Sequence, residues 1–178
     1  MSTTDLILEI LKYVVPAGFV LGGVGMVMRE NRLKAETKEK YGILQQTFAE
    51  MMPLRLQAYE RAILFLERIS PDSIIIRVDG SNKTVQLFQR QLIAEIRAEY
   101  EHNIAQQLYI KNDSWEELVR AKEQTLALIN ATARTLPPDA KGMELGKRVL
   151  QEMSRQENSP TRSAIRALKS DVQQTFRF

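Results

Sequence analysis

The chain has 178 residues, a length that one domain accommodates. Apolar residues make up 44% and charged residues 26%, which excludes a disordered tail and an all-apolar channel. The net charge of +3 is too even for a dedicated nucleic-acid-binding protein. There is no cysteine and a single histidine, His102, so thiol catalysis, disulfides, cysteine-ligated zinc and iron–sulfur clusters are excluded.

An uncharged segment near the N-terminus is the most informative feature of the sequence. Residues 13–28 carry no charge, but a helix of that length is roughly 24 Å long, shorter than a bilayer core of about 30 Å. Extension to residues 6–28 gives a sufficient length and adds Glu9 and Lys12, which can pair three residues apart on one helix face. We therefore expect residues 1–28 to be a transmembrane anchor whose residues 6–28 contact the lipid bilayer.

Two other interpretations of this segment remain open. A cleaved signal peptide would carry basic residues before the apolar run, and the first nine residues contain none. A core helix buried in a soluble oligomer would contain Pro16 and four glycines, which in water cost about 3 kcal/mol for proline and roughly 0.8–1 kcal/mol for each glycine. Membrane helices tolerate both residue types better, so the anchor is favoured.

Basic residues on either side of this segment predict its orientation. Only Lys12 precedes the uncharged run. Five basic residues follow it closely: Arg29, Arg32, Lys34, Lys38 and Lys40. The positive-inside rule then predicts a single-pass protein of the inner (plasma) membrane with residues 29–178 in the cytoplasm. The lack of cysteine agrees with that reducing compartment.

A glycine face within the segment suggests self-association. Gly18 and Gly22 form a Gly-x-x-x-Gly pair, and Gly25 lies on the same helix face. Small residues at this spacing let two helix backbones approach closely in lipid. A homodimer through these three glycines is therefore one hypothesis, although glycine is also simply common in membrane helices.

The remainder of the chain has helical periodicity. Tyr41, Leu44, Phe48 and Met51 follow 3, 4, 3 spacing in a juxtamembrane helix, residues 29–52, which is too short for a sustained coiled coil and could instead be the first bundle helix. We expect Pro53 in the first turn of the next helix. The predicted fold is all-α: a transmembrane helix, then a cytoplasmic bundle of four to five helices with its core in residues 53–136 and basic C-terminal helices in residues 137–178.

Local signals divide the bundle into helices. Ser70 and Pro71 should stop the helix that ends near Ile69, and the β-branched residues 74–78, which lack a partner strand, should form an extended loop or a short helical turn. Further helices are expected over residues 84–109 and 114–136, with Ser114 as an N-cap three residues before Glu117. The residues expected in the core are Leu92, Ile96, Tyr100, Trp115, Leu118, Leu126 and Ile129.

Few residues have the spacing of a chemical site. Glu99 and His102 project together from a helix, as in di-iron carboxylate bundles, with Glu95 on the same face, but those sites need a second histidine. Residues 79–84, Asp-Gly-Ser-Asn-Lys-Thr, lack the glycines of a phosphate-binding loop. We therefore expect no enzyme, and no catalytic, cofactor-binding or metal-binding residue.

The basic C-terminal helices could contact anionic lipid headgroups or nucleic acid, or form a solvated face. Their basic residues are Lys147, Arg148, Arg155, Arg162, Arg166 and Lys169. Aromatic residues for base stacking are absent from residues 139–175, so no nucleic-acid partner is expected.

Three parts of the sequence carry a resemblance: EILKYVVP at residues 9–16, LRLQAYER with LERISP at residues 54–71, and EYEHNIAQQLY at residues 99–109. Together they resemble a family, without assigned activity, of short, single-pass membrane-anchored helical proteins of Bacteroidetes-type bacteria. The resemblance implies one membrane span and a helical cytoplasmic domain without catalysis.

These patterns predict a membrane-anchored helical protein that acts as a non-catalytic interaction or scaffolding module, with an unidentified protein partner. A soluble oligomeric helical protein that buries its N-terminal helix is the second hypothesis. A bundle-type metal-binding protein is the third.

Overall fold

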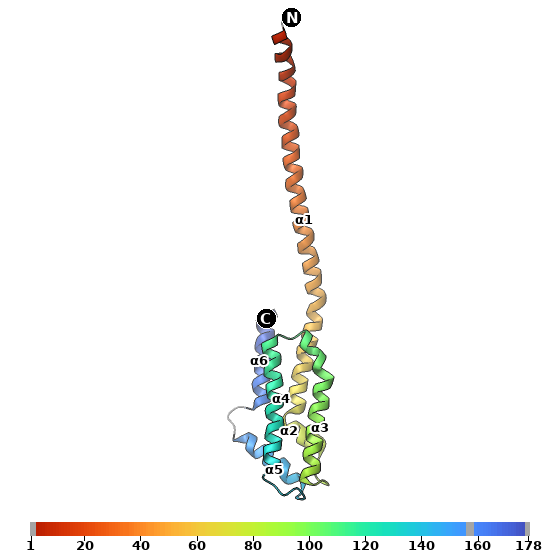
Figure 1. Cartoon of the computed structure of the whole chain (residues 1–178), viewed down its shortest axis with the longest axis vertical. Helices are drawn as coiled ribbons and strands as arrows, with labels where there is room; N and C mark the ends of the chain where they lie inside the picture. Colours follow the sequence, from red (N-terminus) through yellow and green to blue (C-terminus); the bar gives the residue numbers. More distant parts are fainter. Residues whose placement is uncertain (1–2, 156–158, 177–178) are drawn as a thin grey trace. The chain divides into compact units, whose positions relative to one another are not determined.

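The computed structural model describes the backbone of residues 3–155 and 159–176. Within these ranges, the side chains of residues 3–17, 20, 27, 31, 33–37, 39–41, 43, 44 and 176 are outside the description. The described chain contains six α-helices and one 3₁₀ helix, and no strand (Figure 1). The all-α prediction is therefore confirmed.

The chain divides into two compact units, residues 1–51 and residues 52–178. The first unit contains only part of helix α1 (Thr3–Ile69), which continues into the second unit. We expected Pro53 in the first turn of a new helix, and this was wrong, because α1 runs unbroken from Thr3 to Ile69. Pro53 lies inside α1, flanked by strong helix formers such as Met52 and Leu54, and helix propagation is cooperative once begun.

The second unit is a helical bundle built from the end of α1 and the remaining helices. These are α2 (Pro71–Val78), α3 (Val85–Asn103), the 3₁₀ helix η1 (Ile104–Leu108), α4 (Asn112–Ala133), α5 (Gly142–Ser154) and α6 (Pro160–Phe176). The end of α1 runs beside α3, α4 and α6, whereas the short helices α2 and α5 pack together near one end (Figure 1). The β-branched residues 74–78 are thus helical, as the lack of a partner strand suggested.

The boundary between α1 and α2 is set by Ser70. Its backbone leaves the helical region (φ −59°, ψ 139°), and its hydroxyl donates a hydrogen bond of 2.8 Å to the Glu67 carbonyl. Pro71 follows as the first residue of α2, where its missing amide hydrogen costs nothing. The predicted helix end at Ile69 is confirmed.

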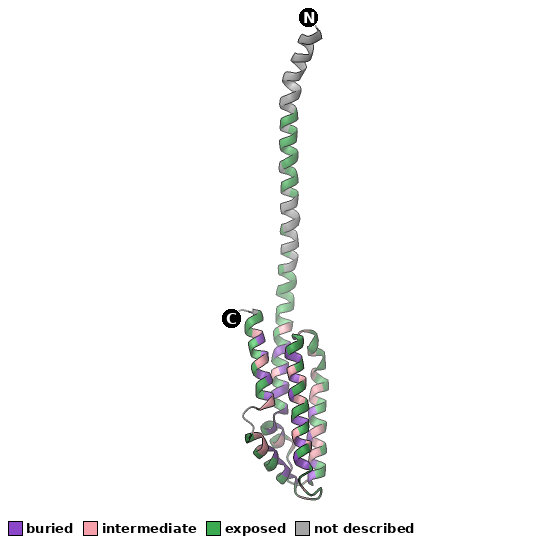
Figure 2. Ribbon diagram, turned by 60° about the vertical axis from the view of Figure 1, so that its left-hand side comes forward, coloured by how far each residue is buried: buried purple, intermediate pink, exposed green. Residues whose placement is uncertain are grey.

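One apolar core joins the α-helices of the bundle (Figure 2). Six of the seven predicted core residues are buried, and Tyr100 is half-buried with its ring 6.0 Å from those of both Phe65 and Trp115. Leu145 of α5 and Leu168 of α6 are fully buried in the same core. Helices α5 and α6, which the sequence set apart by their charge, therefore pack as part of the bundle.

The loops before α3 and before α5 lie against each other. The Gly142 amide donates to the Lys83 carbonyl (2.7 Å), and the Val85 amide donates to the Ala140 carbonyl (2.8 Å). A Cβ atom on Gly142 would lie 2.9 Å from the Gly80 carbonyl oxygen, closer than side-chain carbons approach backbone atoms. Both loops therefore need glycine at their point of contact, and this contact holds α5 against α3.

Candidate functional site

The predicted anchor is only partly within the described residues. The side chains of residues 6–17 are outside the description. Among the later ones, Phe19 and Met26 are 78% and 76% exposed, and a Cβ atom on Gly18, Gly22 or Gly25 would meet no other atom within 4 Å. Within the residues that the structure describes, no helix has the length and apolar character needed to cross a membrane.

The basic residues after the anchor are partly described as well. Arg29, Arg32 and Lys38 are exposed on α1. The side chains of Lys34 and Lys40 are outside the description. The structure thus leaves the three described cations accessible to an anionic surface.

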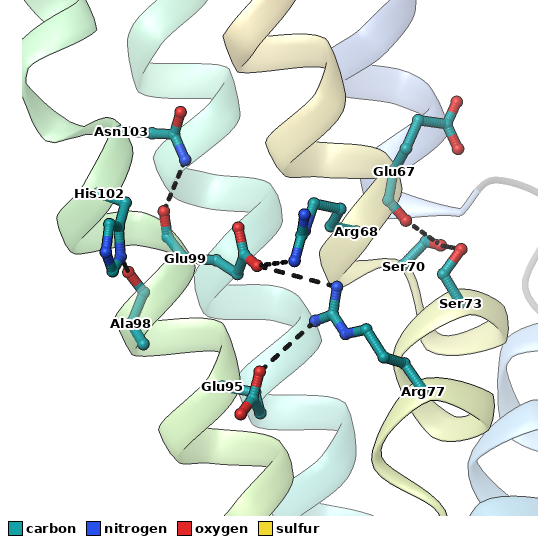
Figure 3. A network of polar contacts seen from close by, with 10 residues as sticks. All are labelled: Glu67, Arg68, Ser70, Ser73, Arg77, Glu95, Ala98, Glu99, His102 and Asn103. Atoms are coloured by element: carbon teal, nitrogen blue, oxygen red, sulfur yellow. Dashed lines mark hydrogen bonds and ion pairs between the residues drawn. The ribbon is translucent and has the colours of Figure 1, made fainter.

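Glu95 and Glu99, which have the spacing of a metal site in the sequence, form ion pairs with arginines. Glu99 of α3 accepts from Arg68 of α1 at 2.6 Å and lies 3.8 Å from Arg77 of α2, which also lies 3.8 Å from Glu95 (Figure 3). Two arginines from different helices thus neutralise the Glu99 carboxylate, which is partly buried. This network ties α1, α2 and α3 together.

His102 is not brought into that network. It is exposed at the end of α3, where its Nδ1 lies 2.7 Å from the Ala98 carbonyl oxygen (Figure 3). Among the described residues, no three histidine or carboxylate side chains come together as metal ligands. In the described structure, Glu95 and Glu99 thus pair with arginines of other helices, whereas His102 contacts the backbone of its own helix.

The loop that faintly resembles a phosphate loop is a closed turn. The amide and hydroxyl of Ser81 donate to the Asp79 carboxylate (3.0 and 2.5 Å) and lower the pKa of that carboxyl. Lys83 Nζ donates to the Val78 carbonyl at 2.5 Å, and Thr84 caps α3 by accepting from the Leu87 amide (3.3 Å). The lysine that would contact a phosphate is thus bound to the backbone.

A buried polar cluster, which we did not predict, links three helices at one end of the bundle. Asp171 of α6 is only 7% exposed, and its Oδ2 accepts from the Tyr59 hydroxyl of α1 (2.5 Å) and from the Ser114 hydroxyl of α4 (2.9 Å). The Tyr59 oxygen also accepts from the Lys111 amide (3.2 Å). Hydrogen bonds to a buried carboxylate are among the stronger ones in proteins, so the cluster fixes α6 on α1 and α4.

This cluster corrects the predicted role of Ser114. Helix α4 begins at Asn112, so Ser114 lies inside its first turn and its hydroxyl binds Asp171 instead of capping a backbone amide. Its partner is 57 residues away in the sequence, which local capping patterns cannot reveal. The available signal was Asp171 itself, a carboxylate three residues after Leu168 on the apolar stripe of α6.

The Tyr59 phenol should make the bundle sensitive to alkaline pH. Burial raises the pKa of Tyr59, and its hydrogen bond to Asp171 raises it further, although the Lys111 amide and Arg55 act in the opposite direction. Because the folded pKa lies above the unfolded value of about 10, the stabilisation is complete below pH 10 and disappears as pH rises through the folded pKa. We expect the difference in unfolding free energy between wild type and Tyr59→Phe, measured by urea titration, to shrink above pH 10. A difference that is unchanged up to pH 12 would contradict this.

The basic residues of α5 and α6 form no pocket-like cluster. All six that the sequence singled out are exposed, and Arg155 pairs with Glu152 at 2.9 Å. The described part of this segment therefore presents its cations to the surroundings while its apolar side enters the core.

These features define the class of protein: a helical bundle with a long N-terminal helix, whose polar clusters hold helices together. The chain belongs to a family described as a family of unknown function (DUF7935), whose model matches residues 5–175. No curated protein and no solved structure matches the chain. The family match covers most of the predicted anchor segment and most of the bundle.

Proposed function

We propose that the protein is a single-pass inner-membrane protein of Bacteroidetes-type bacteria, whose cytoplasmic bundle is a non-catalytic interaction or scaffolding module. Residues 6–28 cross the bilayer, and residues 29–178 face the cytoplasm. Within the anchor, two copies can approach most closely at the face formed by Gly18, Gly22 and Gly25.

The single observation that carries this proposal is the state of the uncharged run, residues 13–28. It is helical throughout, and its described large apolar side chains, such as Phe19, Leu21 and Met26, are exposed. A helix that exposes this much apolar surface needs an apolar environment, because each such side chain gains about 1.5–3 kcal/mol when it leaves water. A bilayer supplies that environment for a run without charges.

The orientation and the scaffolding role are supported by charge and by the nature of the polar clusters. Arg29, Arg32 and Lys38 are exposed directly after the run, where the positive-inside rule places cytoplasmic residues. The ionisable groups that the structure brings together, around Glu99 and Asp171, join helices of the bundle. The bundle surface is thus the part that remains for contact with another protein.

Membrane fractionation with an alkaline carbonate wash tests the proposal. We expect the full-length protein to stay in the washed membrane pellet, and a variant without residues 1–28 to appear in the soluble fraction. Charges in the run should release the full chain too: Leu21→Lys with Val24→Lys adds about 2.5–3.5 kcal/mol per lysine to the cost of insertion. The matched control is Leu64→Lys with Ile76→Lys, because these residues are also exposed apolar side chains but belong to the bundle.

Cysteine labelling tests the orientation in the same preparation. The protein has no cysteine, so Asn82→Cys, at an exposed position, gives a single thiol. In intact cells an impermeant maleimide should leave this thiol unlabelled, and lysis should expose it. Labelling of the thiol in intact cells would place the bundle outside the cytoplasm. In the fractionation experiment, full-length protein in the soluble fraction would favour the soluble oligomer.

A further inference from the structure

The part of α1 just before the bundle carries an apolar seam whose described side chains, Phe48 and Met51, are exposed. The seam follows 3, 4, 3 spacing through Tyr41, Leu44, Phe48 and Met51. Phe48 is 66% exposed and Met51 is 44% exposed, and the neighbouring Met52 is exposed to the same extent as Met51. Large apolar side chains at this spacing on a helix are the pattern that a second helix covers.

The opposite side of the same helix carries polar side chains, with Ile43 among them. Gln46 donates a hydrogen bond to Glu50 at 3.2 Å, a pair that satisfies both side chains along the helix surface. Successive residues are about 100° apart on an α-helix, so Gln46 and Glu50 lie on the side away from Phe48 and Met51. The seam residues Phe48 and Met51 and the polar pair thus lie on different sides of this stretch of α1.

The register of the seam is already used for helix packing further along α1. Continued at 3–4 spacing beyond Met51, it passes through Arg55 and then through Ala58, Ala62, Phe65 and Ile69. These last four residues are buried in the bundle core. One stripe thus packs against other helices in its second half, whereas Phe48 and Met51 in its first half are exposed, which points to a helix as the missing partner.

The charge pattern selects the kind of helix. From Tyr41 to Met52 the only charged residue is Glu50, on the polar side, so the seam and its borders offer no counter-charge to an acidic or a basic partner. A second copy of the same seam is neutral as well. In a parallel pair, like positions face each other, and Phe48 meets Phe48 without any charge opposed.

We propose that residues 41–52 of two chains pair in parallel as a short coiled coil through Phe48 and Met51. The contact is small, because 12 residues of helix extend only about 18 Å. It therefore depends on the local concentration of chains, which the anchor proposed above raises. In this respect the inference rests on the proposed function.

Cysteine crosslinking in the full-length chain tests the pairing without background, because the protein has no cysteine. Single variants Phe48→Cys and Met51→Cys place a thiol on the seam, and Gln46→Cys and Glu50→Cys are the matched variants on the polar side. Disulfides form only where Cα atoms come within about 7 Å, so we expect at least about fivefold more dimer from the seam variants under mild oxidation in cell membranes. Equal crosslinking on both sides, or none on the seam, would overturn the proposal.

A second substitution shows whether the seam itself drives the contact. In the Met51→Cys background, Phe48→Asp should reduce the dimer at least about fivefold, because it places two like charges opposite each other, whereas Gln46→Asp should leave it unchanged. Carbonate washing of the same samples separates the two proposals. Seam crosslinks in protein from the soluble fraction would support the pairing and contradict the anchor. Protein that stays in the washed membrane pellet without seam crosslinks would support the anchor and contradict the pairing.

Discussion

Replacing Phe88 by alanine is expected to lower the free energy of unfolding by about 3–5 kcal/mol, the usual cost of deleting a buried phenylalanine ring. Phe88 is fully buried at the start of α3. A Cβ atom on Gly80 would lie 3.1 Å from its ring, and one on Gly142 would lie 3.1 Å from the Phe88 Cβ. The ring thus fills the space between the two loops, and their backbone hydrogen bonds leave them little freedom to collapse into a cavity.

Urea unfolding of the full chain, followed by circular dichroism, measures this loss. The matched control is Leu87→Ala, on the same helix turn but 45% exposed, which should change the unfolding free energy by no more than about 0.5 kcal/mol. If Phe88→Ala lowered the free energy of unfolding as little as Leu87→Ala, the two loops would have to close over the space that the Phe88 ring leaves. The close contact of the glycines would then not depend on the ring.

Replacing Asp171 by alanine is the change with the second largest expected effect. It removes the carboxylate that accepts hydrogen bonds from the Tyr59 and Ser114 hydroxyls. Each buried hydroxyl that loses this acceptor should lower the free energy of unfolding by about 1–3 kcal/mol. Asp171→Asn keeps the shape and an accepting oxygen, so it should lose less. Thr175→Ala is the control, because Thr175 is exposed and its hydroxyl contacts Asp171 only at 3.4 Å.

A double-mutant cycle identifies the cause of that loss. In the Asp171→Ala background, Tyr59→Phe removes one orphaned hydroxyl and should cost less than it does in the wild-type protein. Tyr59→Phe also removes the acceptor of the Lys111 amide, both in the wild-type and in the Asp171→Ala background. The cost of that lost hydrogen bond therefore cancels in the cycle. Strictly additive losses would show that the two side chains act independently and that the hydrogen bond at 2.5 Å contributes nothing to stability.

The proposed anchor and the proposed seam contact concern association, whereas Phe88 and Asp171 concern the stability of the bundle. Both bundle variants keep residues 1–52 intact, so they should leave carbonate-resistant membrane retention unchanged if the anchor acts independently of the bundle. This separation is useful in practice, because a chain with a weakened bundle remains a valid sample for the crosslinking of Phe48→Cys and Met51→Cys.

Much of the bundle was predictable because its helices obey a local period. Leu92 and Ile96 on α3, and Leu118 and Ile129 on α4, are buried as the 3.6-residue period predicted. The end of α1 at Ile69 was equally predictable, since the residue before a proline, here Ser70, is disfavoured in the helical region. Such signals depend only on neighbours within one or two turns.

Other features depended on residues far apart in the sequence. The sequence by itself determined the all-α class, most of the buried stripe, and the uncharged run at residues 13–28. Only the tertiary structure decided that Ser114 binds Asp171 and that Gly80 and Gly142 touch. The physical reason is that burial follows from local periodicity, whereas the partner of a buried hydroxyl or of a glycine is chosen by how distant helices pack.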